Sequence, residues 1–196
     1  MNRPAPLFLE ENHLIRQLQK ADETAFRYFV ASYQSKVYNT IISIVQETNE
    51  AEDLTQEVFI EVYESVHQFR GDAKLSTWVY RIATQKAVES LRKRKTQKRF
   101  AFLSSLFGKE DQYQVSDFVH PGVALENQER AKILFKHIGQ LADNQKVAFT
   151  LCHVEGLSYQ EIAEVMQVSL SAVESLIHRA KQNLRKSLKS YYSLTD

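Results

Sequence analysis

Residues 158–186, SYQEIAEVMQVSLSAVESLIHRAKQNLRK, contain two short helical patterns separated by a break of three residues. Ser158 is followed by Glu161 in the spacing of a capping box, which predicts that a helix begins there. After the break, apolar residues return every three or four positions. The small Ala163 lets the second helix pack closely across the first, so the stretch predicts a helix-turn-helix at about 158–181. The predicted inward residues of the second helix are Val173, Ile177, Ala180, Leu184 and Leu188.

The beginning of the second predicted helix carries few groups that read DNA bases strongly. In a helix-turn-helix these residues enter the major groove first. Ser171 can bond a phosphate or a base edge, Glu174 can accept a hydrogen bond from cytosine, and Ala172 can contact a thymine methyl group. Positive charge follows further along the helix, at Arg179 and Lys181 among others. We therefore expect a weak DNA-binding element that needs assistance, with an ordinary helical hairpin as the alternative.

The remainder of the chain also has the composition and periodicity of helices. Its 196 residues include only five glycines and three prolines, and residues of high helix propensity are plentiful. Apolar residues recur at helical spacing through most of the chain, but this period fades between 100 and 122. We expect an all-α protein of two small helical domains, residues 1–99 and 123–196, joined by a flexible linker at 100–122.

Local signals set the expected helix boundaries. A break at Ala21-Asp22 divides the first helical pattern in two. Asn49, followed by Glu52, predicts the capped start of the next helix, and Gly71 ends that pattern. In the C-terminal half, helices are expected at 126–138 and 144–154, and Ser169 or Ser171 is expected to cap the last helix.

Charge is distributed unevenly, although the formal net charge is only +1. Residues 46–66 contain seven acids and no Lys or Arg, whereas residues 67–99 contain ten bases and two acids. The alternation fits two solvated helix faces linked by salt bridges. The run RKRKTQKR at 92–99 exceeds what a solvated face needs, and it indicates contacts with phosphate groups.

Signals of catalysis or metal binding are few. The single cysteine, Cys152, excludes an internal disulfide, and no Cys/His cluster has the spacing of a structural zinc site. Cys152 and His153 are adjacent, and adjacent side chains on a helix diverge, so we expect Cys152 to be a core residue rather than a nucleophile. A helical enzyme remains an alternative that no phosphate loop or paired carboxylates support. We expect no metal or cofactor, and the lack of a leader or a membrane-length apolar run predicts a cytoplasmic protein.

Two separated stretches of the sequence resemble one family of transcription factors. Residues 51–95, AEDLTQEVFIEVYESVHQFRGDAKLSTWVYRIATQKAVESLRKRK, resemble region two of bacterial RNA polymerase sigma factors, and residues 158–186 resemble region four. The two stretches have the order and spacing of the extracytoplasmic-function (ECF) type. The resemblance implies a sigma region 2 bundle and a sigma region 4 helix-turn-helix. Such a protein binds core RNA polymerase, recognises the −10 and −35 promoter elements and initiates transcription of a specific set of genes.

The resemblance also implies roles for individual residues. The helix matching DLTQEVF would dock on the clamp helices of the polymerase beta-prime subunit, and region four would contact the beta flap. The loop from Gln68 to Lys74 and the helix after it would capture the −10 strand, with basic groups on its backbone and an aromatic group against its bases. The implied polymerase contacts are Asp53, Gln56, Glu57 and Glu61. The implied −10 contacts are Arg70, Lys74, Thr77, Tyr80, Arg81, Lys86 and Arg92. The implied −35 contacts are Ser169, Ser171, Ala172, Glu174, Ser175, His178, Arg179 and Lys181.

The implied partners are core RNA polymerase, promoter DNA and an anti-sigma factor. No small-molecule substrate is implied, and the membrane would be reached only indirectly, through the anti-sigma factor. The sequence departs from the family in region four, where Gln167 stands in the turn that often holds glycine and where Leu176 replaces a polar residue. Trp78 can stack on a base or pack in the core, and its place on an apolar stripe favours the core.

Two other classes of protein remain open. A stand-alone helix-turn-helix regulator would lack a polymerase-docking helix and would bind a palindrome as a dimer. A scaffold, such as an anti-sigma factor or an adaptor, would leave the basic tract at 92–99 unexplained.

Overall fold

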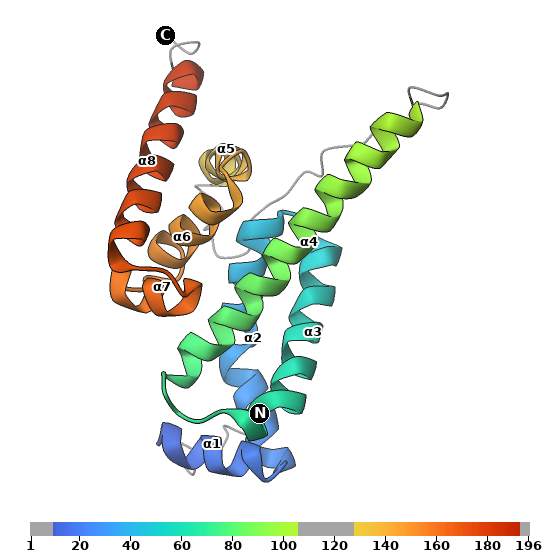
Figure 1. Ribbon diagram of the computed structural model, residues 1–196, viewed down its shortest axis with the longest axis vertical. Coiled ribbons are helices and arrows are strands. Elements are labelled where there is room, and N and C mark those ends of the chain that lie inside the picture. Colours follow the sequence, from blue (N-terminus) through green and yellow to red (C-terminus); the bar gives the residue numbers. More distant parts are fainter. Residues whose placement is uncertain (1–9, 106–127, 193–196) are drawn as a thin grey trace.

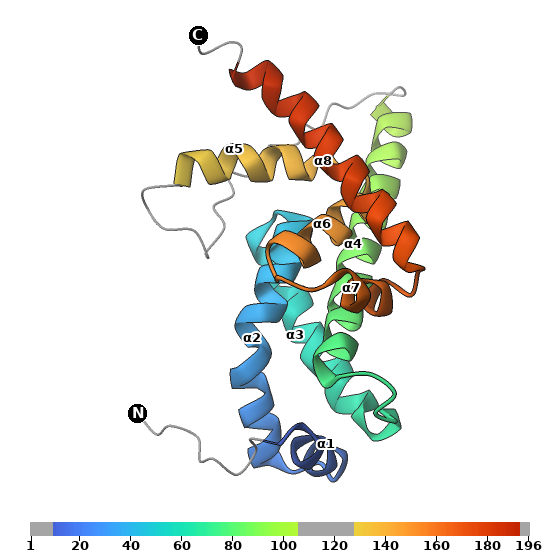
Figure 2. The ribbon, with the colours of Figure 1, turned by 90° about the vertical axis from the view of Figure 1, so that its left-hand side faces the viewer.

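A computed structural model of the chain describes residues 10–105 and 128–192, which form helices and short connections (Figures 1 and 2). No strand occurs within these two ranges, so the all-α prediction is confirmed. The helices are α1 (Glu11–Gln19), α2 (Glu23–Val45), α3 (Thr48–Ser65), the short 3₁₀ helix η2 (Val66–Gln68), α4 (Leu75–Ser105), α5 (Gln128–Gly139), α6 (Asp143–His153), α7 (Tyr159–Met166) and α8 (Leu170–Tyr192).

The N-terminal half is a bundle in which α2, α3 and α4 pack against one another (Figure 1). Each helix contributes fully buried apolar side chains, including Phe29 of α2, Val58 of α3 and Leu75 of α4. The shorter α1 lies across the end of the bundle at which α4 begins (Figure 1). The Glu11 carboxylate of α1 accepts a hydrogen bond of 2.8 Å from the backbone N–H of Leu75, so α1 caps the start of α4.

Of two predicted helix boundaries in this half, one is confirmed and the other is wrong. The break at Ala21-Asp22 is confirmed, because Asp22 caps α2 by accepting a 2.7 Å hydrogen bond from the backbone N–H of Ala25. The predicted cap at Asn49 is wrong. The Glu47 side chain caps α3 instead, since its carboxylate reaches the backbone N–H groups of Asn49 and Glu50 and leaves Asn49 inside the helix.

The helix-turn-helix is formed by α7 and α8. The Ser158–Glu161 capping box is confirmed, with each side chain accepting a hydrogen bond from the other residue's backbone N–H. The turn contains no glycine because Gln167 itself adopts the left-handed conformation, at φ 55°. Ser169 caps α8 by accepting from the backbone N–H of Ala172. The predicted inward residues of α8 are buried as expected, except for Leu188, which is half-buried.

The two predicted domains pack against each other in this arrangement and share apolar contacts. Helices α6 and α7 lie against α2 and α4 (Figure 2). A continuous cluster joins buried side chains such as Phe29 and Val79 of the first half to Leu151 and Ile162 of the second. α4 also continues to Ser105, well into the predicted linker, and the rest of that linker lies outside the described residues.

A second contact between the halves depends on a glycine. Gln46 leaves α2 in the left-handed conformation, at φ 57°, and its amide donates a 2.6 Å hydrogen bond to the carbonyl of Phe135 in α5. The Gln46 side chain occupies the space that a Cβ atom on Gly139 would fill. A larger residue at position 139 would have to displace the Gln46 amide and with it the hydrogen bond to Phe135.

Lys146 of α6 is a buried cation close to other cations. Its side chain is 5% exposed. Burial, helped by the charges of Lys95 and Arg94 on α4 and opposed by that of Asp143, lowers its pKa from 10.5 to about 8. The carboxylate of Asp143 is 2.7 Å from the ammonium of Lys95. Lys146 therefore weakens the folded state when it carries its charge.

Replacing Lys146 by methionine should stabilise the protein at pH 7, by about 2 kcal/mol, because the variant fills the same space without a buried charge. The unfolded chain keeps the proton on this amine up to about pH 10.5, whereas the folded chain releases it near pH 8. The stability of the wild type should therefore rise with pH between these values. Urea denaturation at pH 7 and pH 9.5 should show the advantage of Lys146→Met shrinking at the higher pH. An advantage of equal size at both pH values would contradict the buried charge.

Candidate nucleic-acid and partner interfaces

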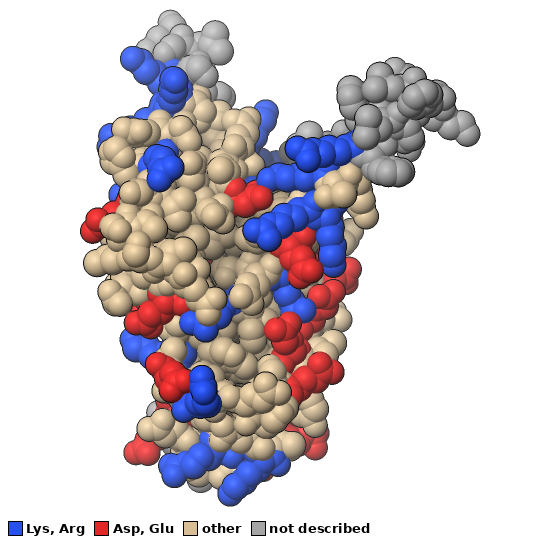
Figure 3. Space-filling view, in the orientation of Figure 1, with Lys and Arg blue, Asp and Glu red and all other residues tan. Residues whose placement is uncertain are grey.

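An outward stripe of polar side chains runs along α3. Asp53, Gln56 and Glu57 are exposed and Glu61 is half-buried, while the opposite side of the helix faces the bundle core. Figure 3 shows acidic side chains along the α3 edge of the molecule and Lys and Arg side chains on the outer part of α4. The predicted polymerase-binding residues therefore share one accessible acidic face.

Exposed apolar residues continue this stripe. Ile60 and Tyr63 are 57% and 54% exposed. Together with Phe26 and Phe59 they line an apolar groove of about 330 Å³ between α2 and α3. These residues were missed from sequence, although Ile60 and Tyr63 lie off the buried stripe of α3, which was the available signal. Exposed aromatic and aliphatic side chains beside a charged rim are typical of a protein-binding surface.

Lys86, predicted to contact the −10 strand, lies on the acidic face instead. Its ammonium is 3.0 Å from the carboxylate of Glu61 and 3.3 Å from that of Glu57. The three residues thus connect α4 to α3, and Lys86 borders a polar groove of about 360 Å³ between these helices.

Four of the remaining predicted −10 residues fall into two groups. Arg70 and Arg92 are exposed, and Arg70 pairs with Asp72 at 3.3 Å. Thr77 and Tyr80, by contrast, are only 2% and 6% exposed. A nucleic acid cannot reach these two side chains in this arrangement, which differs from the open strand path that the sequence predicts.

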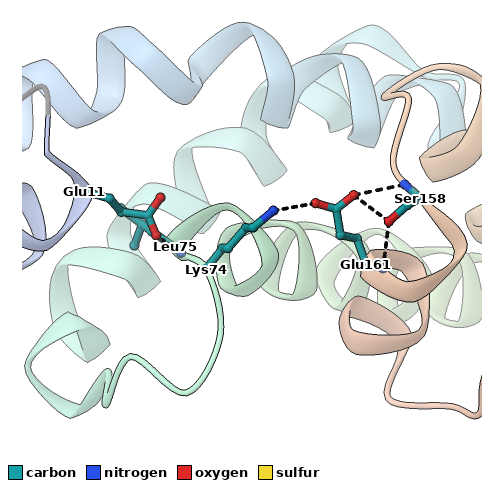
Figure 4. Close-up of polar contacts among 5 residues, drawn as sticks. All are labelled: Glu11, Lys74, Leu75, Ser158 and Glu161. Atoms are coloured by element: carbon teal, nitrogen blue, oxygen red, sulfur yellow. Dashed lines mark hydrogen bonds and ion pairs between the residues drawn. The ribbon is translucent and has the colours of Figure 1, made fainter.

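Groups in α7 and in the segment before it contact three of the predicted −10 residues, and Figure 4 shows the first of these contacts, between Lys74 and Glu161. The Lys74 ammonium is 2.9 Å from the Glu161 carboxylate. The Tyr80 hydroxyl donates a 2.8 Å hydrogen bond to the Glu155 carboxylate. The Arg81 guanidinium donates a 2.8 Å hydrogen bond to the backbone carbonyl of Glu164. The C-terminal half therefore satisfies groups that the sequence assigns to DNA.

These contacts shift the pKa values of the groups involved. The hydrogen bond from Lys74, and after it those from Ser158, lower the pKa of Glu161 to about 2. Burial raises the pKa of Glu155, and burial followed by the Glu155 charge raises that of Tyr80 above its usual range. At neutral pH, Tyr80 is therefore a hydrogen-bond donor, and Glu161 is a charged acceptor for Lys74.

The predicted −35 residues lie on the free side of α8. The exposed ones are Ser169, Ser171, Glu174, Ser175, His178 and Arg179, while Ala172 and Lys181 are half-buried. Leu170 adds an apolar side chain that is 44% exposed. Leu176 packs against the main core, so it does not belong to this face. One accessible surface therefore combines hydroxyl, carboxylate, imidazole and guanidinium groups.

Other residues singled out from sequence have structural positions. Trp78 packs on Phe69, with ring centroids 5.1 Å apart, and supports the core as predicted. Cys152 is half-buried, and burial raises the pKa of its thiol. Within the described ranges, no group of His, Cys, Asp and Glu side chains has the geometry to hold a metal ion. No helix described here has both the length and the apolar character needed to cross a membrane.

Comparison with known proteins identifies both halves. Residues 29–97 match the family "Sigma-70 region 2", and residues 132–184 match the family "Sigma-70, region 4". The RNA polymerase sigma-H factor of Pseudomonas aeruginosa is 34% identical over 91% of this chain and 94% of its own length. The ECF RNA polymerase sigma factor SigW of Bacillus subtilis is 32% identical over 89% of this chain and 95% of its own length.

Solved structures share the fold of the whole chain. CnrH in complex with the cytosolic domain of CnrY has a TM-score of 0.67 at 19% identity, covering 92% of this chain and 97% of CnrH. RpoE from Bartonella quintana, solved with the anti-sigma factor NepR, has a TM-score of 0.64 at 20% identity, covering 84% of this chain and 96% of RpoE. The two regions, their order and the near full-length relatives show that this chain belongs to the ECF sigma factors of the sigma-70 family.

Proposed function

We propose that this chain recruits core RNA polymerase through the acidic face of α3 and directs it to promoters through α4 and α8. In this proposal α4 takes the −10 strand after melting, and the free face of α8 contacts the −35 duplex. The chain acts in the cytoplasm as an initiation factor and performs no chemistry of its own. The observation that carries the proposal is the separation of two accessible faces, acidic on α3 and polar on α8.

The charge of each face supports its proposed partner. The stripe of Asp53, Gln56, Glu57 and Glu61 carries no cation of its own. The neighbouring Lys86 of α4 is paired with two of its acids, Glu57 and Glu61. Such a face favours a basic protein surface over a phosphate backbone. The α8 face combines a guanidinium with hydroxyl groups near a capped helix start, which favours phosphate and base edges.

The proposed partners are core polymerase, promoter DNA and an anti-sigma factor. Similarity to RpoE, which was solved with an anti-sigma factor, supports the third partner. The apolar groove at Ile60 and Tyr63 offers a surface for a protein partner beside the acidic stripe. No feature of the structure favours a stand-alone regulator.

Glu57→Lys should weaken binding to core polymerase by about ten-fold or more, because it places a cation where the proposed partner is basic. Glu57 is exposed, so the free energy of unfolding should change by less than about 0.5 kcal/mol. Fluorescence anisotropy with purified core polymerase at moderate salt measures the affinity, and run-off transcription measures the outcome. Glu23→Lys is the matched control, since Glu23 is also exposed and paired with a cation, Arg27, but lies on α2. Equal effects of both substitutions, or no effect of Glu57→Lys, would remove the α3 face from the proposal.

Substitutions on α8 and α4 should impair different steps of initiation. Replacing Arg179 and Lys181 by alanine removes two cations, so it should weaken −35 duplex contact and reduce the salt dependence of binding by about two units of slope. Tyr80→Ala should instead impair −10 melting. Transcription from a template with a pre-melted −10 bubble should rescue Tyr80→Ala at least in part, but not the α8 variant. Identical responses of the two variants to the bubble would contradict this division of labour.

A further inference from the structure

The segment 155–167, which includes α7, is acidic and lies on the most basic helix of the protein. It contains Glu155, Glu161 and Glu164 and no Lys, Arg or His. Glu155 and Glu161 contact α4 or the residue before it through their carboxylates, and Glu164 does so through its backbone carbonyl. The charge of Glu164 also acts on the Lys74 ammonium.

The oxygen atoms of this segment make the contacts that a nucleic acid strand would make. Lys74 and Arg81 are the groups expected to hold phosphates, and here they bind a carboxylate oxygen and a carbonyl oxygen at 2.9 Å and 2.8 Å. Phosphate oxygens accept the same kind of hydrogen bond from ammonium and guanidinium groups. The Tyr80 ring, expected to meet bases, is buried in the same interface.

We propose that residues 155–164 imitate the −10 strand, so that the helix-turn-helix covers α4 in the free protein and must leave before the strand can bind. The proposal rests on the function proposed above, since that function assigns α4 to the −10 strand. Strand binding and closure of the two halves then compete for Lys74, Tyr80 and Arg81. For this reason the free protein binds single-stranded DNA weakly, whatever the sequence of the strand.

The exposure of these surfaces also indicates the order of two steps, docking on polymerase and opening of the two halves. The acidic face of α3 and the outer face of α8 stay exposed in the closed arrangement, so neither needs the halves to separate. Among the groups assigned to the −10 strand, Tyr80 is buried and Lys74 and Arg81 are bonded to the other half, whereas Arg70 and Arg92 remain exposed. Docking on polymerase can therefore precede opening, and opening becomes the step that delivers α4 to the strand.

Two substitutions separate strand imitation from simple support of the fold. Glu161→Gln removes the charge facing Lys74 but keeps the capping box, because glutamine also fits that position. Glu155→Gln keeps an acceptor for the Tyr80 hydroxyl without the charge. The double variant should bind a fluorescently labelled, twelve-nucleotide single strand of randomised sequence about five-fold more tightly than the wild type, measured by anisotropy on the full chain.

Two controls show whether the gain comes from the interface. The pair Glu23→Gln and Glu52→Gln changes the net charge by the same amount on exposed sites away from α4, and it should leave the affinity within about two-fold. Ser158→Ala removes the hydroxyl that bonds the Glu161 carboxylate but leaves the Glu161 charge beside Lys74, so its gain in affinity should be well below that of the double variant. An equal gain in either control, or no gain in the Glu155/Glu161 double variant, overturns the proposal.

Run-off transcription by the wild type with core polymerase distinguishes a failure of this proposal from a failure of the proposed function on which it rests. Promoter-specific transcripts without a gain in strand affinity would overturn strand imitation and leave the proposed function standing. A gain in strand affinity without any transcript would support the masking of α4 and overturn the assignment to initiation.

Discussion

The packing of α7 onto α4 fixes the arrangement of the whole chain. Buried side chains of both halves form one apolar cluster, and the Tyr80–Glu155 hydrogen bond lies within that contact. The Lys74–Glu161 ion pair at its edge is exposed, so it adds orientation more than stability. The apolar contact therefore provides most of the cohesion, and the polar contacts decide which face of α4 is covered.

This arrangement separates the surfaces of the protein by accessibility. Acidic side chains on α3 and polar side chains on α8 face solvent, whereas Tyr80 and Arg81 of α4 bond to the other half. In the proposed function, such a chain binds protein and duplex DNA before it binds single-stranded DNA. The buried charge of Lys146, near Arg94 and Lys95 of α4, weakens the packing of α6 at this contact.

Features that depend on residues a few positions apart could be predicted from sequence. The Ser158–Glu161 capping box, the break at Ala21-Asp22 and the inward stripe of α8 are such features, and they are confirmed. Even locally, Glu47 was overlooked as the cap of α3 because Asn49 is the commoner capping residue type. The burial of Tyr80 and the pairing of Lys74 could not be predicted, since their partners lie 75 and 87 positions away. The only signal in the sequence was charge, since residues 155–167 contain acids and no bases whereas the earlier helix α4 is basic.

The distance between the two halves tests the account most directly. Spin labels at Glu23→Cys on α2 and Gln182→Cys on α8, both exposed positions, in a Cys152→Ser background, report this distance by double electron–electron resonance. The account predicts one narrow distance in the free chain. It predicts a longer distance in the complex with core polymerase and a promoter whose −10 element is pre-melted. The same distance in the free chain and in the transcribing complex would contradict the covering of α4 by α7.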